Sequence, residues 1–323
     1  MIPVAVKGTG VHLPERIVTN DDLARMVDTS DEWITSRTGI RERRWLAADR
    51  AVSDMCVDAA REAMASADTS ARELDVIIVA TYTWDQPLPS TALIVKEALG
   101  ADRALTLDIT QAACANGVQA LLLAAHLLQT SAARTVLVIA ADCASRVTDP
   151  RERTTRIFFG DAAGAAVLHR GAGDSALLSW DFGSELSYEV QIRAGGSRLP
   201  TSETTVAQRE HFLAMNGRAV WDTATRWLPD SILTAAAKAE VPIERIDHFF
   251  LHQANVNIIN AALDKLGIPA GKAPVTLDRL GNTGSAGVFT ALHSRFADVK
   301  PGEVFVMSAI GAGFQWGTLC FRH

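Results

Sequence analysis

Three short segments of this chain each place one reactive polar residue among small neighbours. They are residues 111–117, 251–255 and 281–284. Small residues let the backbone and a substrate approach closely. The segments supply the thiol of Cys114, the imidazole of His252 and the carboxamide of Asn282. A thiolate can accept an acyl group, and the other two groups can donate hydrogen bonds to developing negative charge. The three together predict acyl transfer, which none of them would indicate alone.

Cys114 lies between a strand expected at 105–109 and a helix expected at 118–129. The positive end of a helix dipole lowers the pKa of a thiol, so we expect a reactive thiolate here. The backbone N–H of Cys114 would also be free to donate to an oxyanion. The alternative is a small core residue at a tight junction, which alone would be the better interpretation.

The other three cysteines are interpreted as buried core residues. They are Cys56, Cys143 and Cys320. The four cysteines form no CxxC pair and no metal-ligand spacing with histidine, so no metal site is predicted. In an intracellular chain they would stay reduced.

His252 and Asn282 lie in segments that differ from ordinary turns. His252 follows an apolar strand expected at 249–251, and its next neighbours are polar and rich in carboxamides. Asn282 lies in a glycine-rich loop, where a simple turn is the alternative. That loop lacks the lysine of a P-loop and the spacing of a dinucleotide fingerprint. A second glycine-rich segment, 311–317, could supply N–H groups to an oxyanion hole.

The composition excludes several classes of protein. With 323 residues, 48% of them hydrophobic and 21% charged, the chain is typical of a soluble globular protein with a large core. A net charge of −6 argues against nucleic-acid binding. The apolar runs are too short to cross a membrane, and the first residues lack a signal peptide. We therefore expect a cytoplasmic protein with no membrane partner.

Alternating strand-like and helix-like segments predict a layered α/β fold. We expect two halves, 1–172 and 173–323, joined at 171–175, that form a diverged repeat. In the first half two aspartates are 33 residues apart (75 to 108), and in the second they are 31 apart (247 to 278). Both pairs end in Thr-Leu-Asp and precede a small-residue loop and a helical stretch. The repeat predicts that the loops of Cys114 and Asn282 meet near a pseudo-twofold axis.

A papain-like cysteine protease is a competing interpretation. Cys114 and His252 are 138 residues apart (114 to 252), which fits that family, and an asparagine follows. However, Cys114 is far from the start of the chain and no CGSCW-like motif surrounds it. The internal repeat has no place in that family either.

The chain resembles the β-ketoacyl-ACP synthase III group of the thiolase superfamily over nearly its whole length. The matching segments, in order, are 28–34, 37–43, 111–117, 159–166, 252–255 and 311–317. The resemblance implies a thiolase-like five-layered αβαβα fold, built from two duplicated halves, and a homodimer.

The resemblance also implies the roles of the site residues. Cys114 would be acylated from an acyl-CoA, and His252 and Asn282 would bind the thioester carbonyl of a malonyl group and stabilise its enolate. The N–H groups of Cys114 and Gly313 resemble an oxyanion hole. Trp33 and Arg153 match positions that hold the adenine of CoA, with Arg37 close by. No cofactor would be bound permanently, because acyl-CoA is a substrate.

Two departures from the family's pattern concern the partners. Where a basic patch for acyl carrier protein is typical, this chain has Asp222, Asn257 and Asp264, with Lys265 retained. Segment 82–89, in the acyl pocket, contains an unusual Trp84 that would fill space or line a channel. These departures favour, as an alternative, a pathway-specific enzyme of secondary metabolism that uses a CoA-linked or small-molecule acceptor. They also predict weak, salt-insensitive use of carrier protein. A catalytically silent partner subunit is disfavoured, because all three polar residues are present.

Overall fold

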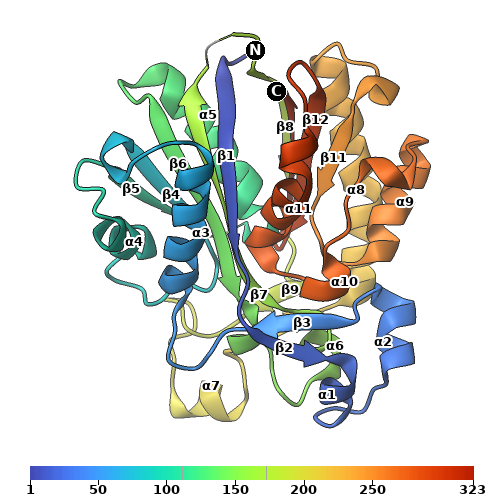
Figure 1. Cartoon of the computed structure of the whole chain (residues 1–323). Coiled ribbons are helices and arrows are strands. Elements are labelled where there is room, and N and C mark those ends of the chain that lie inside the picture. Colours follow the sequence, from blue (N-terminus) through green and yellow to red (C-terminus); the bar gives the residue numbers. More distant parts are fainter. Residues whose placement is uncertain (111, 172) are drawn as a thin grey trace.

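The computed structural model describes residues 1–110, 112–171 and 173–323, which form two sheets between three layers of helices (Figure 1). The order of the layers is helix, sheet, helix, sheet, helix. This is the five-layered αβαβα architecture that the sequence predicts.

The first sheet has the strand order β1-β7-β6-β4-β5. Its strands are β1 (Val4–His12), β4 (Val76–Ala80), β5 (Leu105–Ile109), β6 (Thr135–Cys143) and β7 (Asp161–Arg170). Strand β4 runs parallel to β5 and β6, whereas β7 is antiparallel to both β6 and β1. Every residue of β4 and β6 is buried, as expected for parallel strands that are covered by helices on both faces.

The second sheet has the order β11-β12-β13-β8. Its strands are β8 (Ala176–Ser184), β11 (His248–Leu251), β12 (Val304–Gly311) and β13 (Gln315–Arg322). Strands β11 and β12 are parallel, and the next two pairs are antiparallel. This repeats the pattern of β4, β6, β7 and β1, so the predicted duplication is present in the topology.

The two halves differ in one detail. In the first half Thr-Leu-Asp lies within strand β5, but in the second half it leads into the short helix α10 (Leu277–Leu280). The second sheet therefore lacks a counterpart of β5. The predicted boundary between the halves stays a prediction, because residue 172 of the junction lies outside the described residues.

Helices separate and cover the sheets. The outer face of the first sheet carries α3 (Val52–Ser66) and α4 (Thr91–Leu99), and that of the second carries α8 (Gly217–Lys238) and α9 (Val256–Leu266). Between the sheets lie α5 (Asn116–Thr130) and α11 (Gly287–Arg295), which contact strands of both. Helix α3 packs so closely on β1 that a Cβ atom at Gly10 would lie 2.4 Å from the α3 backbone.

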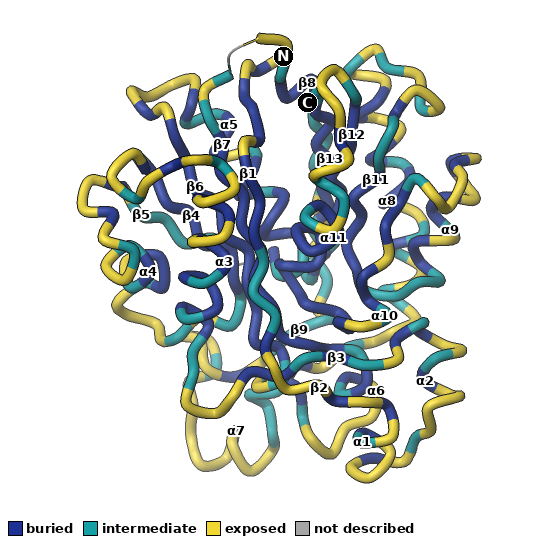
Figure 2. Tube along the Cα trace, viewed as in Figure 1, coloured by how far each residue is buried: buried dark blue, intermediate teal, exposed yellow. Residues whose placement is uncertain are grey.

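Most of the other elements form a cap, which comprises residues 13–50, 144–160 and 185–216. They are β2 (Arg16–Thr19), α1 (Asn20–Ala24), α2 (Asp31–Thr38), β3 (Glu42–Trp45), η3 (Ala144–Arg146), α6 (Arg153–Arg156), β9 (Val190–Ile192), α7 (Glu203–Ala207) and β10 (Leu213–Met215). Short turns elsewhere are η1 (Ala71–Glu73), η2 (Ala113–Ala115), η4 (Ile243–Arg245), η5 (Ala270–Lys272), η6 (Gly284–Ala286) and η7 (Phe296–Asp298). Figure 2 shows that the sheets and central helices are largely buried, whereas the cap is mostly exposed. None of the described helices is long and apolar enough to cross a bilayer.

Candidate active site

Cys114 lies in the turn η2, directly before the central helix α5. Its predecessor Ala113 has a φ of +44°, an unusual conformation for a residue with a Cβ atom. The turn is held from both halves of the chain: Asn116 Oδ1 accepts a hydrogen bond from the N–H of Ala112 (2.7 Å), and Ser285 Oγ donates to the Ala113 carbonyl (3.0 Å). The strained turn is thus over-determined, as is common at functional sites. Gln111, the first residue of the predicted motif, lies outside the described residues.

The prediction of a lowered thiol pKa is wrong. Burial and, to a smaller extent, the nearby carboxylate of Asp142 raise the pKa of Cys114 to about 12. Desolvation disfavours the thiolate more strongly than the start of helix α5 favours it. The resting residue is therefore a thiol, and it has to lose its proton as it attacks.

A direct test is the pH dependence of alkylation at Cys114. A thiol with a pKa far above the assay range gains about tenfold in thiolate per pH unit. The rate of iodoacetamide labelling at Cys114, followed by peptide mass spectrometry, is expected to rise about tenfold per unit from pH 7 to 10. A short unstructured peptide that contains one cysteine, with an ordinary pKa of about 8.5, serves as the control and should level off above pH 9. A plateau for Cys114 below pH 8 would restore the helix-dipole prediction.

His252 follows strand β11 and is held as a neutral ring. The backbone N–H of His252 donates to the Ser308 carbonyl (2.9 Å), and only 6% of the residue is exposed. Burial lowers the pKa of His252 to about 4, so the imidazole is uncharged at neutral pH. Its Nδ1 atom is buried without a hydrogen-bond partner among the described residues. A neutral ring still has one N–H to donate.

Gly287, the first residue of α11, leaves room for this ring. A Cβ atom at position 287 would lie 2.8 Å from Nδ1 of His252, which is too close for a real contact. We expect Gly287→Ala to displace the imidazole and to lower condensation at least about tenfold, while Cys114 is still acylated. Steady-state condensation and intact-protein mass after acyl loading measure the two effects. Gly196→Ala, at a site with open space, is the matched control. Unchanged condensation in Gly287→Ala would show that the ring position is not critical.

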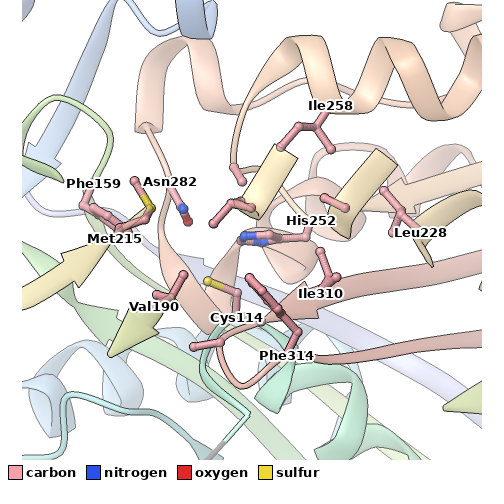
Figure 3. A pocket seen from close by; sticks show the side chains of 15 residues that line it. Cys114, Phe159, Val190, Met215, Leu228, His252, Ile258, Asn282, Ile310 and Phe314 are labelled. Carbon is pink, nitrogen blue, oxygen red and sulfur yellow. The ribbon is translucent and has the colours of Figure 1, made fainter. Parts of the chain in front are cut away.

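Asn282 is fixed by its backbone and by its side chain. Its N–H donates to the Phe158 carbonyl (2.7 Å), and its carbonyl accepts from the N–H of Gly160 (3.0 Å). Its Oδ1 accepts from the N–H of Gly284 (3.0 Å), which leaves the amide N–H groups to donate elsewhere. Figure 3 shows the Asn282 amide, the His252 ring and the Cys114 sulfur around the same space. The predicted meeting of the two loops is confirmed.

These three side chains line one open cavity, here called the main cavity. The rest of its wall is largely apolar and includes Val220, Ala224 and Leu228 of helix α8. A dry, apolar wall strengthens the few polar contacts inside it.

A second open cavity, here called the side cavity, also reaches Cys114. Its wall includes Tyr82, Trp84, Gln191 and Ile192. The predicted role of Trp84 as a lining residue is therefore confirmed. The thiol lies where the two cavities meet, as a residue that passes an acyl group between two substrates would.

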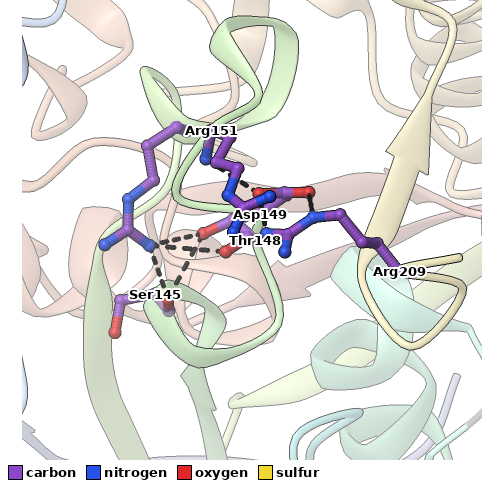
Figure 4. A network of polar contacts seen from close by, with 6 residues as sticks. Ser145, Thr148, Asp149, Arg151 and Arg209 are labelled. Atoms are coloured by element: carbon purple, nitrogen blue, oxygen red, sulfur yellow. Dashed lines mark hydrogen bonds and ion pairs between the residues drawn. The ribbon is translucent and has the colours of Figure 1, made fainter. Parts of the chain in front are cut away.

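A polar network stabilises the part of the cap that lines both cavities (Figure 4). The carboxylate of Asp149 accepts two hydrogen bonds from the guanidinium of Arg209, which lowers the pKa of the carboxyl. The N–H of Leu213 donates to the Val147 carbonyl (2.7 Å). These contacts hold β10 against the loop that leads to α6, so Leu213 and its neighbours keep their place along the cavities.

The predicted CoA-binding residues lie on the cap. The guanidinium of Arg153 lies 4.9 Å from the centre of the Trp33 ring, within the range of a cation–π contact. The Arg37 carbonyl accepts hydrogen bonds from Asn255 and Asn257. The structure thus brings Trp33 and Arg153 together, and their role with CoA stays a prediction.

Gly313 lies in the turn between β12 and β13, with a φ of +128° that favours glycine. Its neighbours Ala312 and Phe314 line the main cavity. The predicted oxyanion hole of Cys114 and Gly313 is untested and stays a prediction. Within the described residues, no group of three or more His, Cys, Asp or Glu side chains could hold a metal ion.

Asp142, at the end of β6, is a site residue that the sequence analysis missed. Its carboxylate is fully buried and accepts hydrogen bonds from the N–H groups of Tyr82 (3.0 Å) and Ser285 (2.6 Å). It therefore ties the first half to the loop of Asn282. Burial raises its pKa to about 7. An aspartate that closes an apolar strand is the signal that could have found it.

The comparisons with known proteins agree with this geometry. Residues 107–185 match the family model described as 3-oxoacyl-[acyl-carrier-protein (ACP)] synthase III, and residues 236–323 match the model of its C terminal. A β-ketoacyl-[acyl-carrier-protein] synthase III of Symbiobacterium thermophilum is 43% identical over 99% of this chain and 98% of its own. The chain belongs to the β-ketoacyl-[acyl-carrier-protein] synthase III family. The resemblance stated from the sequence is confirmed, and the papain-like alternative is wrong.

Solved structures extend this family assignment to the fold. The 3-oxoacyl-[acyl-carrier-protein] synthase III of Aquifex aeolicus superposes with a TM-score of 0.90 at 37% identity, over 99% of this chain and all of the other. The priming β-ketosynthase of the R1128 polyketide pathway superposes with a TM-score of 0.90 at 30% identity, over 99% of this chain and 96% of its own. The synthase III family thus includes relatives from fatty-acid-type and polyketide systems.

Proposed function

We propose that this synthase III takes an acyl group from acyl-CoA onto Cys114 and condenses it with a malonyl thioester to give a 3-oxoacyl thioester. The observation that carries the proposal is the convergence of Cys114, His252 and Asn282 on one cavity. No permanently bound cofactor is needed, because the acyl-CoA is itself the substrate.

The first half-reaction is a thioester exchange. The sulfur of Cys114 attacks the acyl carbonyl, the C–S bond to CoA breaks, and CoA leaves with the proton that the thiol loses. The N–H groups of Cys114 and Gly313 would stabilise the oxyanion of the tetrahedral intermediate. Trp33 and Arg153, with Arg37 nearby, would hold the adenine of CoA.

The second half-reaction forms a carbon–carbon bond. His252 and Asn282 donate hydrogen bonds to the thioester carbonyl of the malonyl group, and the malonyl carboxylate leaves as CO2. The electron pair of that bond becomes an enolate, whose charge on oxygen these donors stabilise. Its carbon then attacks the acyl-Cys114 carbonyl, and the released thiolate takes a proton from water. A neutral His252 suits this role, because it donates a hydrogen bond to the enolate oxygen without having to change its own charge.

The acceptor is proposed to be malonyl-acyl carrier protein. The relatives are named for that carrier, and they do not favour the alternative of a CoA-linked or small-molecule acceptor. The charges near the predicted docking patch are partly paired: Arg218 contacts Asp222 (3.0 Å), and Lys265 contacts Asp230 (2.9 Å). Paired surface charges steer a partner only weakly. This supports a weak salt dependence of the reaction with carrier protein, which stays a prediction.

The test compares malonyl-carrier protein with malonyl-CoA as partners for one acyl-CoA. We expect 3-oxoacyl-carrier protein as the main product by mass spectrometry, with kcat/KM changing less than about threefold between low and high salt. Turnover with malonyl-CoA alone would overturn the proposed acceptor. A steep loss of rate with salt would instead show an intact basic docking surface.

We also propose a homodimer, located in the cytoplasm. Strand β5 ends the first sheet, and exposed leucines lie on it (Leu105) and on helix α4, which packs against it (Leu93). An open edge strand with apolar neighbours is a surface that proteins usually cover. Light scattering on the purified chain measures the assembly, and a monomer at micromolar concentration would contradict it.

A further inference from the structure

Asn257 departs from the basic pattern expected at the docking patch, and the structure gives its side chain a different contact. Asn257 Nδ2 donates a hydrogen bond to the backbone carbonyl of Arg37 (2.9 Å). Asn255 Nδ2 donates to the same carbonyl (3.1 Å), and Asn255 Oδ1 accepts from the backbone N–H of Asn257 (2.9 Å). Two amides at the start of helix α9 therefore hold one carbonyl of helix α2.

The carbonyl that they hold lies in the last turn of α2, where carbonyl groups lack partners within the helix. Gly39 ends α2 directly afterwards, with a left-handed φ of +80°. Val256 of α9 packs on this glycine so closely that a Cβ atom at position 39 would lie 2.5 Å from Val256 Cγ1. The end of α2 is thus fixed on α9 both by hydrogen bonds and by close packing.

This contact connects α2 to the wall of the main cavity. Ala254 and Ile258 line that cavity, and Asn255 and Asn257 lie between them in the chain. Helix α2 also carries Trp33, whose indole is exposed and offers a face on which a planar base can stack. The position of this indole relative to the cavity therefore depends on the bonds from the start of α9.

We infer that Asn257 is a positioning residue for the acyl donor: it holds α2 so that Trp33 meets the nucleotide end of the acyl-CoA that loads Cys114. This inference rests on the proposed function, because it takes acyl-CoA as the donor and Trp33 as a contact of its adenine. It assigns Asn257 to the loading step, in place of a contact with carrier protein. Loss of the amide would loosen α2 and weaken the nucleotide contact, while the thioester end of the donor keeps its surroundings.

The test compares donors with and without the nucleotide. Acetyl-, butyryl- and octanoyl-CoA are tried first, and the best of them is paired with the pantetheine thioester of the same acyl group. We expect Asn257→Ala to lower kcat/KM for this acyl-CoA at least about fivefold, mainly through KM, and that for the pantetheine thioester less than about twofold. The kcat/KM for malonyl-carrier protein should also change less than about twofold.

A double-mutant cycle asks whether Asn257 acts through Trp33. Once Trp33→Ala has removed the indole, Asn257→Ala should change kcat/KM for the acyl-CoA less than about twofold. Asn260→Ala, at an exposed position of α9, is the matched control and should behave like the wild type. Val256→Ala loosens the same contact and keeps both amides, so it should show the same donor dependence and decides if Asn257→Ala does not fold.

Four results would overturn the inference: an unchanged rate with the acyl-CoA, an equal loss with both donors, a loss confined to malonyl-carrier protein, or a loss that persists without the indole. An equal loss with both donors would show that Asn257 only supports the fold around the cavity. If no acyl-CoA of the set acylates the wild-type Cys114, the proposed function itself fails.

Discussion

Cys114→Ala is expected to abolish covalent acylation completely. After incubation with an acyl-CoA, the wild-type chain should gain the mass of one acyl group, and the variant should gain none. The physical reason is access: Cys114 lies on both cavities, whereas Cys56, Cys143 and Cys320 are buried in the core. Intact-protein mass spectrometry measures the result.

Cys143→Ala and Cys56→Ala are the controls for this experiment. Cys143 is the more stringent, because its thiol lies near the site and donates a weak bond to Asp161 (3.4 Å). Both variants should be acylated like the wild type. A mass shift that persists in Cys114→Ala, or disappears in Cys143→Ala, would move the nucleophile to another residue.

The layered fold was predictable, because its buried strands and helices show clear hydrophobic patterns in the sequence. The expected strand at 105–109 is observed as β5, the expected helix at 118–129 lies within α5, and the expected strand at 249–251 lies within β11. The repeat was visible for the same reason, since each half repeats a strand, a small-residue loop and a helix. The halves differ at Thr-Leu-Asp: these residue types lie within strand β5 in the first half and lead into helix α10 in the second. Local sequence did not encode the absence of an edge strand.

The identities of the site residues were predictable, but their electrostatics were not. The position of Cys114 before helix α5 favoured a low thiol pKa. The pKa is instead raised, because burial and Asp142 act from outside the local sequence. Asp142 belongs to β6 and meets Ser285 143 residues later in the chain. Such a contact depends on how the halves pack, which no local pattern contains.

Asn282→Ala is expected to separate the two half-reactions. Acylation of Cys114 should continue, because Asn282 is proposed to contact only the malonyl thioester. Decarboxylation and condensation should fall by about 10²- to 10³-fold, the usual loss for one donor to a developing oxyanion, about 3 kcal/mol. The fixed Oδ1 bond to Gly284 makes the amide N–H groups available as donors, and alanine removes them. Intact mass reports acylation, and release of labelled CO2 reports the second step.

Asn260→Ala is the matched control, since Asn260 is exposed on helix α9 and lies outside both cavities. It should leave both half-reactions unchanged. The retained acylation of Asn282→Ala matters as much as the lost condensation, because a misfolded variant would lose both. Should Asn282→Ala condense at the normal rate, the amide would not be a donor to the enolate, and a malonyl thioester would cease to be the best candidate for the acceptor. Loss of both half-reactions in a variant that keeps the circular dichroism spectrum of the wild type would instead make Asn282 a residue that positions the Cys114 turn, through the loop that Ser285 and Asp142 hold in place.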